Sequence, residues 1–179
     1  MAVTPTKETA VVFSQYDPKW GSYVYYNGPI KRTISTSGCG VVALTNAVYA
    51  LNGNFINPTK IASFSAKRGH YYYMQGTNDT LYKDYAKKYG SQYDFKHSGK
   101  VYSLTKLKKH LKKGGTAIAL VPGHYIAITA YRASDNSYLV LDSAVYNKRP
   151  TTITGDWVSA STLKTGVMKC EYYHLFSRR

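Results

Sequence analysis

The most informative stretch of this chain is SGCG at Ser37–Gly40, which is followed directly by VVALTNAVY at Val41–Tyr49. The apolar run predicts a buried helix, so Cys39 is expected where an irregular segment becomes the first helical turn. Free N–H groups and the positive end of the helix dipole favour the thiolate there, and they can also bind an oxyanion. Cys39 is therefore a candidate nucleophile. The alternative is a structural thiol, since free cysteine is among the most buried residue types.

A thiolate needs a base, and the downstream sequence offers one. His124 opens the apolar run Tyr125–Tyr131, which predicts a strand, and the turn ASDNS at residues 133–137 follows. The next predicted strand, Tyr138–Leu141, ends in Asp142. Two antiparallel strands joined by this short loop would bring Asp142 beside the imidazole. A carboxylate in that position fixes the tautomer and stabilises the imidazolium.

A fourth candidate, Gln15, lies upstream in the segment FSQYDPKW at Phe13–Trp20. Its side-chain amide can donate a hydrogen bond to an oxyanion beside the backbone N–H of Cys39. A glutamine near the N-terminus can equally be an ordinary surface residue. The order Gln, Cys, His, Asp along the chain is what makes Gln15 a candidate site residue.

Four short motifs in this order resemble the papain-like cysteine peptidases, and most closely the stand-alone relatives of the bacteriocin-processing (double-glycine leader) peptidases. They are QYDPKW at 15–20, SGCG at 37–40, GHYI at 123–126 and VLD at 140–142, and the likeness spans about residues 13–146. The resemblance implies that Cys39 is the nucleophile and His124 the general base. It also implies that Asp142 orients the histidine and that Gln15 donates to the oxyanion.

The order of elements predicts an α+β fold of the papain-like type, with N-terminal helices packed on a mostly antiparallel sheet. The 179 residues suit a single catalytic domain, with residues 1–12 expected to be a flexible N-terminal segment. The expected helices are the nucleophile helix ending at Leu51–Gly53, then Pro58–Arg68, Asn78–Tyr89 and Ser103–Lys113; the expected strands are Thr116–Val121, Tyr125–Arg132, Tyr138–Leu141 and Tyr172–Phe176.

Charge suggests the kind of partner. The chain has 24 Lys and Arg against 9 Asp and Glu, a formal net charge of +15, which attracts polyanions. Nucleic acid, anionic membranes and teichoic-acid-bearing cell walls all qualify, and charge alone does not choose among them, although no motif specific for nucleic acid occurs. Together with the family resemblance, the charge makes peptidoglycan the expected partner, with wall teichoic acid as a further one. No metal or cofactor is expected. Cys170 is interpreted as a core or idle thiol, and the remaining histidines as ordinary packing or surface residues: His70, His97, His110 and His174.

The sequence therefore predicts a cysteine hydrolase that cleaves amide bonds of bacterial peptidoglycan through an acyl-enzyme, as an endolysin or murein hydrolase does. One alternative is a peptidase or transpeptidase acting on a protein or leader peptide. The other is a non-catalytic basic module that binds anionic wall polymer. The N-terminus lacks an apolar signal core, and no run approaches the ~20 apolar residues of a membrane span. A monomeric phage lysis protein or a protein acting at the cell wall is expected.

Overall fold

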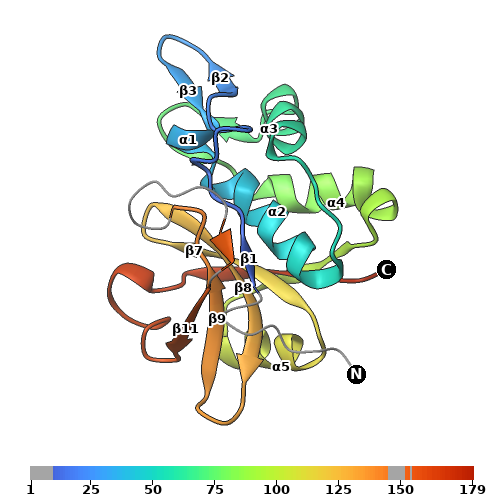
Figure 1. Cartoon of the computed structure of the whole chain (residues 1–179), viewed down its shortest axis with the longest axis vertical. Helices are drawn as coiled ribbons and strands as arrows, with labels where there is room; N and C mark the ends of the chain where they lie inside the picture. Colours follow the sequence, from blue (N-terminus) through green and yellow to red (C-terminus); the bar gives the residue numbers. More distant parts are fainter. Residues whose placement is uncertain (1–9, 145–151, 154) are drawn as a thin grey trace.

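The computed structural model describes residues 10–144, 152–153 and 155–179. Its centre is a six-stranded sheet in the order β11-β9-β8-β7-β12-β6, in which every neighbouring pair is antiparallel. Helix α2 lies against this sheet, with α3 and α4 beyond it (Figure 1). The expected α+β architecture, helices packed on an antiparallel sheet, is confirmed.

The central helix α2, Cys39–Asn52, is apolar along most of its length because it is enclosed on nearly all sides. Every residue from Gly40 to Val48 is buried. Two of these are polar and form hydrogen bonds: Thr45 donates to the carbonyl of Ile56, and the Asn46 amide bridges the backbone N–H and C=O of Phe13. The helix ends at Gly53, whose φ of 81° is the left-handed conformation that glycine adopts without strain.

Strands β7, β8 and β9 form the middle of the sheet and carry the two faces of its core. They span Thr116–Val121, His124–Arg132 and Ser137–Leu141. On one face Ile118 and Ala127 belong to the core that also contains α2. On the other face Ile126 and Ile128 pack with Leu107 of helix α5. The sheet is thus covered by helices on both faces, which holds its central strands rigidly.

The remaining elements complete the sheet or form short hairpins. Strands β6 (Lys96–Val101), β11 (Asp156–Ser159) and β12 (Tyr172–Ser177) complete the main sheet, and the other helices are α1 (Ile34–Ser37), α3 (Pro58–Lys67), α4 (Thr80–Tyr93), α5 (Leu104–Lys112) and the 3-10 turn η1 (Gly166–Met168). Three two-stranded pairs lie outside it: β1 (Val11–Val12) with β10 (Thr152–Ile153), β2 (Val24–Asn27) with β3 (Lys31–Thr33), and β4 (Tyr71–Tyr72) with β5 (Gly76–Thr77).

The structure differs from the sequence predictions at three places. Helix α4 continues through Gly90 to Tyr93, because the chain turns at Asp94, which has a positive φ of 53°, rather than at the glycine. Strands β6 and β11, helix α1, the 3-10 turn η1 and the short hairpins were not predicted. Residues 1–9 of the expected flexible segment lie outside the described residues, whereas Ala10 and Val12 are buried and Val11–Val12 pairs with β10. In the described part of the chain, no helix is both long and apolar enough to cross a bilayer.

Candidate active site

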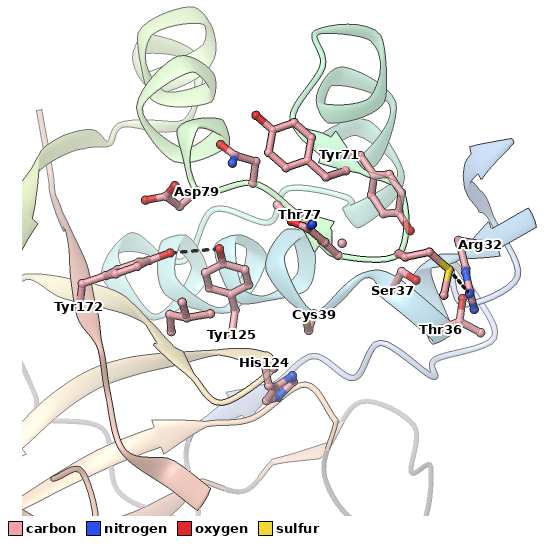
Figure 2. Close-up of a pocket in the computed structure, with 17 residues that line it drawn as sticks. Arg32, Thr36, Ser37, Cys39, Tyr71, Thr77, Asp79, His124, Tyr125 and Tyr172 are labelled. Atoms are coloured by element: carbon pink, nitrogen blue, oxygen red, sulfur yellow. Dashed lines mark hydrogen bonds between the residues drawn. The ribbon is translucent and has the colours of Figure 1, made fainter. Parts of the chain in front are cut away.

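A cleft of about 490 Å³ lies between the helical half of the molecule and the sheet. Figure 2 shows Cys39 at the start of α2 and His124 facing it from the sheet side. The walls come from α1, from the β4–β5 hairpin and from strands β7, β8 and β12. The residues that line the cleft include Arg32, Cys39, Thr77, Asp79, His124 and Tyr172. The cleft therefore brings together two of the predicted site residues from positions 85 apart in the sequence.

Cys39 is the first residue of α2, as the sequence predicted, and it is half-buried. The preceding residue, Gly38, is the N-cap and supplies no capping side chain, so the dipole and N–H groups of a fourteen-residue helix are directed at the thiol region. The neighbouring Gly40 lies against β5: an added Cβ would lie 2.6 Å from Cβ of Thr77. Only glycine allows this close approach of α2 to the cleft wall.

His124 is the first residue of β8 and follows Gly123, whose φ of 67° turns the chain out of β7. Its Nε2 lies 2.7 Å from Oδ1 of Asp142, and the ring faces Cys39 across the cleft (Figure 2). Because Nε2 is engaged by the carboxylate, Nδ1 is the nitrogen left for the thiol. Burial lowers the pKa of His124, but the contacts with Asp142 and Cys39 outweigh it and raise the pKa to about 10.

Asp142 directly follows β9, where pairing of Leu141 with Ala127 of β8 places it beside the histidine strand. Its Oδ1 accepts hydrogen bonds from His124 and from the backbone N–H of Ala144. Burial raises the pKa of Asp142, yet the interaction with His124 prevails and the pKa lies below its usual range. The carboxylate is therefore ionised at neutral pH and holds the imidazolium in place.

Gln15 is buried, not a surface residue, and both ends of its amide are held. Its Nε2 donates to the carbonyl of Ser35 at 2.9 Å, and its Oε1 accepts from the hydroxyl of Ser143 at 3.1 Å. Ser35 lies in α1, just before Cys39, and Ser143 is next to Asp142. The structure thus places Gln15 between the segments that carry the nucleophile and the carboxylate, with one of its two amide N–H groups committed to Ser35.

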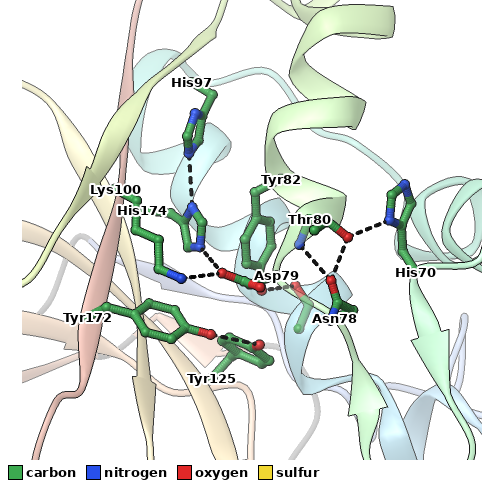
Figure 3. Close-up of polar contacts among 11 residues, drawn as sticks. His70, Asn78, Asp79, Thr80, Tyr82, His97, Lys100, Tyr125, Tyr172 and His174 are labelled. Atoms are coloured by element: carbon green, nitrogen blue, oxygen red, sulfur yellow. Dashed lines mark hydrogen bonds and ion pairs between the residues drawn. The ribbon is translucent and has the colours of Figure 1, made fainter.

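A second polar network lies at the other end of the cleft and was missed by sequence reasoning. Asp79 Oδ2 accepts from Nζ of Lys100 at 2.8 Å and from Nε2 of His174 at 2.9 Å, and His97 contacts Nδ1 of His174 at 2.9 Å (Figure 3). Burial acts to raise the pKa of Asp79, but the contacts with Lys100 and His174 keep it lowered. His97 and His174 are thus linked by hydrogen bonds to Asp79 and are not ordinary packing or surface residues. No local sequence signal relates residues so far apart.

The other titratable side chains considered as candidates are held by structural contacts or by burial. His70 contacts Thr80 and Asp84, and His110 contacts the carbonyls of Thr116 and Phe176. Cys170 is a free, half-buried thiol, and burial raises its pKa to about 11. Within the described ranges, no group of three or more His, Cys, Asp or Glu side chains has an arrangement that could hold a metal ion.

Comparison with known proteins gives a match over most of the chain. The model of the "Peptidase_C39 like family" matches residues 8–164. No curated protein matches. A similar solved chain is described as "Crystal structure of a double glycine motif protease from AMS/PCAT transporter in complex with the leader peptide"; it has a TM-score of 0.49 and 14% identity, and the likeness covers 79% of this chain and 84% of that chain.

Proposed function

This chain belongs to the peptidase C39-like family, and from that premise we propose that Cys39, His124 and Asp142 are its catalytic residues. Membership confirms the papain-like cysteine peptidase class predicted from the sequence. It also counts against the interpretation as a non-catalytic wall-binding module. The observation that carries the proposal is that one imidazole contacts both the thiol of Cys39 and the carboxylate of Asp142.

The reaction follows from the positions of these groups. Because the pKa of His124 is raised, its imidazole can hold the proton that Cys39 gives up as Sγ attacks the carbonyl carbon of the substrate. His124 then gives its proton to the leaving amine, and the acyl group remains on sulfur. A water molecule, deprotonated by His124, hydrolyses the thioester and regenerates the thiol. Asp142 stays ionised throughout and holds the ring.

The oxyanion is assigned to two donors. One is the backbone N–H of Cys39 at the start of α2, where the helix dipole favours negative charge. The other is the second amide N–H of Gln15, whose first N–H is fixed by the Ser35 carbonyl. The Ser143 hydroxyl orients the amide so that its nitrogen points toward the nucleophile segment.

A peptide segment of a protein, such as a leader peptide, is the first substrate candidate, because the family is one of peptidases. The peptide bonds of bacterial peptidoglycan, as cut by an endolysin, are the second candidate. The formal net charge of +15 favours it, since such a surface concentrates the enzyme on anionic wall polymers. The chemistry at Cys39 is the same for both.

The proposal is tested by mass spectrometry of fragments released from a mixed peptide library and from purified peptidoglycan. Cys39→Ala should release none, whereas Cys170→Ala, which removes the other thiol, should cleave as wild type does. New termini from the peptide library alone support a protein substrate, and new termini in the wall sample support the second candidate. Full cleavage by Cys39→Ala would overturn the mechanism.

A further inference from the structure

Arg32 lines the cleft, and no carboxylate among the described residues pairs with its positive charge. Among the described lining residues, the others are His124, which is paired with Asp142, and Asp79, which is paired with Lys100 and His174. The guanidinium of Arg32 forms no ion pair within the described part of the chain. Its side-chain contact is Nη2 to Sδ of Met74 at 3.2 Å, and a thioether is a weak acceptor for a group with five N–H donors.

Other arginines show what a guanidinium does here when a carboxylate is in reach. Arg68 makes two hydrogen bonds to Asp84, of 2.7 and 3.1 Å. Arg132 makes two to Asp135, of 2.9 and 2.6 Å. Arg32 is half-buried in the catalytic cleft and has no such partner among the described residues. A half-buried guanidinium that lines a cleft and lacks a carboxylate partner can bind a carboxylate of the substrate through two parallel hydrogen bonds.

The backbone of Arg32 is held firmly relative to the nucleophile. Arg32 lies in β3, opposite Tyr26 of β2, and the Tyr26 ring stacks on Tyr71 of β4 at 4.8 Å. The neighbouring Tyr25 hydroxyl lies 2.8 Å from Oγ1 of Thr77, the residue that abuts the nucleophile helix at Gly40. Strand β3 also runs directly into α1 and from there to Cys39. The backbone of Arg32 is therefore fixed relative to Cys39, which limits the stretch of the cleft that its guanidinium can reach.

The charges also give the cleft a direction. Figure 2 shows Arg32 at one end of the lining and Asp79 and Tyr172 at the other, with Cys39 between them. At the Asp79 end the cation Lys100 is already paired with the Asp79 carboxylate, so that end offers a substrate carboxylate no unpaired cation among the described lining residues. An anionic substrate group is accepted at the Arg32 end.

We propose that Arg32 forms a carboxylate-binding subsite of the catalytic cleft, so that preferred substrates carry an acidic side chain or a free carboxyl end at one fixed position relative to the scissile bond. The inference rests on the proposed peptidase function and names its substrate class. Both sources of the carboxylate present the same chemistry, and peptides with an internal Glu and an amidated end, or with no Glu and a free end, distinguish them.

The test uses two readouts, of which one needs no turnover. Bromoacetyl peptides with zero to three glycines before either Glu or Gln alkylate Cys39, forming a thioether and releasing bromide. The second readout is kcat/KM for library peptides in matched Glu and Gln forms. The expected Glu-to-Gln rate ratio for wild type is roughly 10-fold or more at one spacing, as for a charge-assisted hydrogen bond. In Arg32→Ala it should fall to near one, and in Arg32→Glu below one.

Lys31→Ala is the matched control, because it removes the same charge from an exposed neighbour in β3 that does not line the cleft. It should keep the wild-type ratio. A ratio near one for wild type, or an unchanged ratio in Arg32→Ala, overturns the subsite even if peptides are cleaved. If Cys39 cleaves nothing and resists every probe, the proposed function fails instead. Anisotropy titration of Cys39→Ala with labelled Glu and Gln peptides then decides the subsite, and equal binding overturns it.

Discussion

Replacing Asp142 by Asn should lower the pH at which activity is lost on the alkaline side. The substitution keeps the shape of the side chain and an oxygen acceptor for Nε2 of His124, but it removes the negative charge 2.7 Å from the ring. That charge supports the imidazolium against the burial that opposes it. Because the pKa of His124 is raised, the imidazolium needed to protonate the leaving amine persists until the pH rises through about 10.

The size of the shift follows from the contact. A hydrogen bond to a charged group contributes about 1.5–3 kcal/mol, and one pKa unit corresponds to about 1.4 kcal/mol, so losing the charge should lower the pKa of His124 by roughly 1 to 2 units. The wild-type kcat/KM profile should therefore fall off near pH 10. The profile of Asp142→Asn should fall off about 1 to 2 units lower, with a reduced maximum.

The assay pairs this profile with an NMR titration of the His124 ring, which reports its protonation without turnover. Asp135→Asn is the matched control, because this exposed aspartate pairs with Arg132 in the turn between β8 and β9. It should change neither readout. The same alkaline limit in wild type and in Asp142→Asn, by both readouts, would refute the role given to the carboxylate.

Three further predictions concern helix α2 and Gln15. Gly40→Ala places a methyl group 2.6 Å from Cβ of Thr77 and should lower the free energy of unfolding in urea by roughly 1–3 kcal/mol. In the double variant, Thr77→Gly should recover part of this loss, and strict additivity of the two changes would contradict the clash. Gln15→Ala should reduce kcat by roughly 10²- to 10³-fold if the amide binds the oxyanion, and a change below about threefold would exclude that role. Asn46→Ala leaves the buried N–H and C=O of Phe13 without their partner, so unfolding experiments should show a loss of roughly 2–6 kcal/mol; a loss below 1 kcal/mol would contradict it.

The parts that sequence reasoning could predict are those set by local patterns. The apolar run after Cys39 is continuous because α2 is enclosed, and the strands that follow residue 115 are apolar because helices cover both faces of the sheet. The short turn between β8 and β9 brings Asp142 back to the strand of His124, but the register in which the two side chains meet also depends on a β-bulge between Ile128 and Ala130, which periodicity does not reveal. Charge and periodicity could not predict β6, whose sequence KHSGKV at Lys96–Val101 carries polar residues on an outer strand.

The walls of the cleft could not be predicted from local patterns, because they are built from contacts between short hairpins. Strands of two or three residues, such as β3 and β5, have no periodicity to detect. Arg32 and Thr77 gain their significance only when stacked tyrosines bring the two hairpins together. The start of α2 at Cys39 can therefore be recognised from the sequence, whereas the side chains that line the cleft come together only in the tertiary structure. If Arg32 binds a substrate carboxylate as proposed, its substitution should alter which peptide is cut and leave the chemistry proposed for Cys39 unchanged.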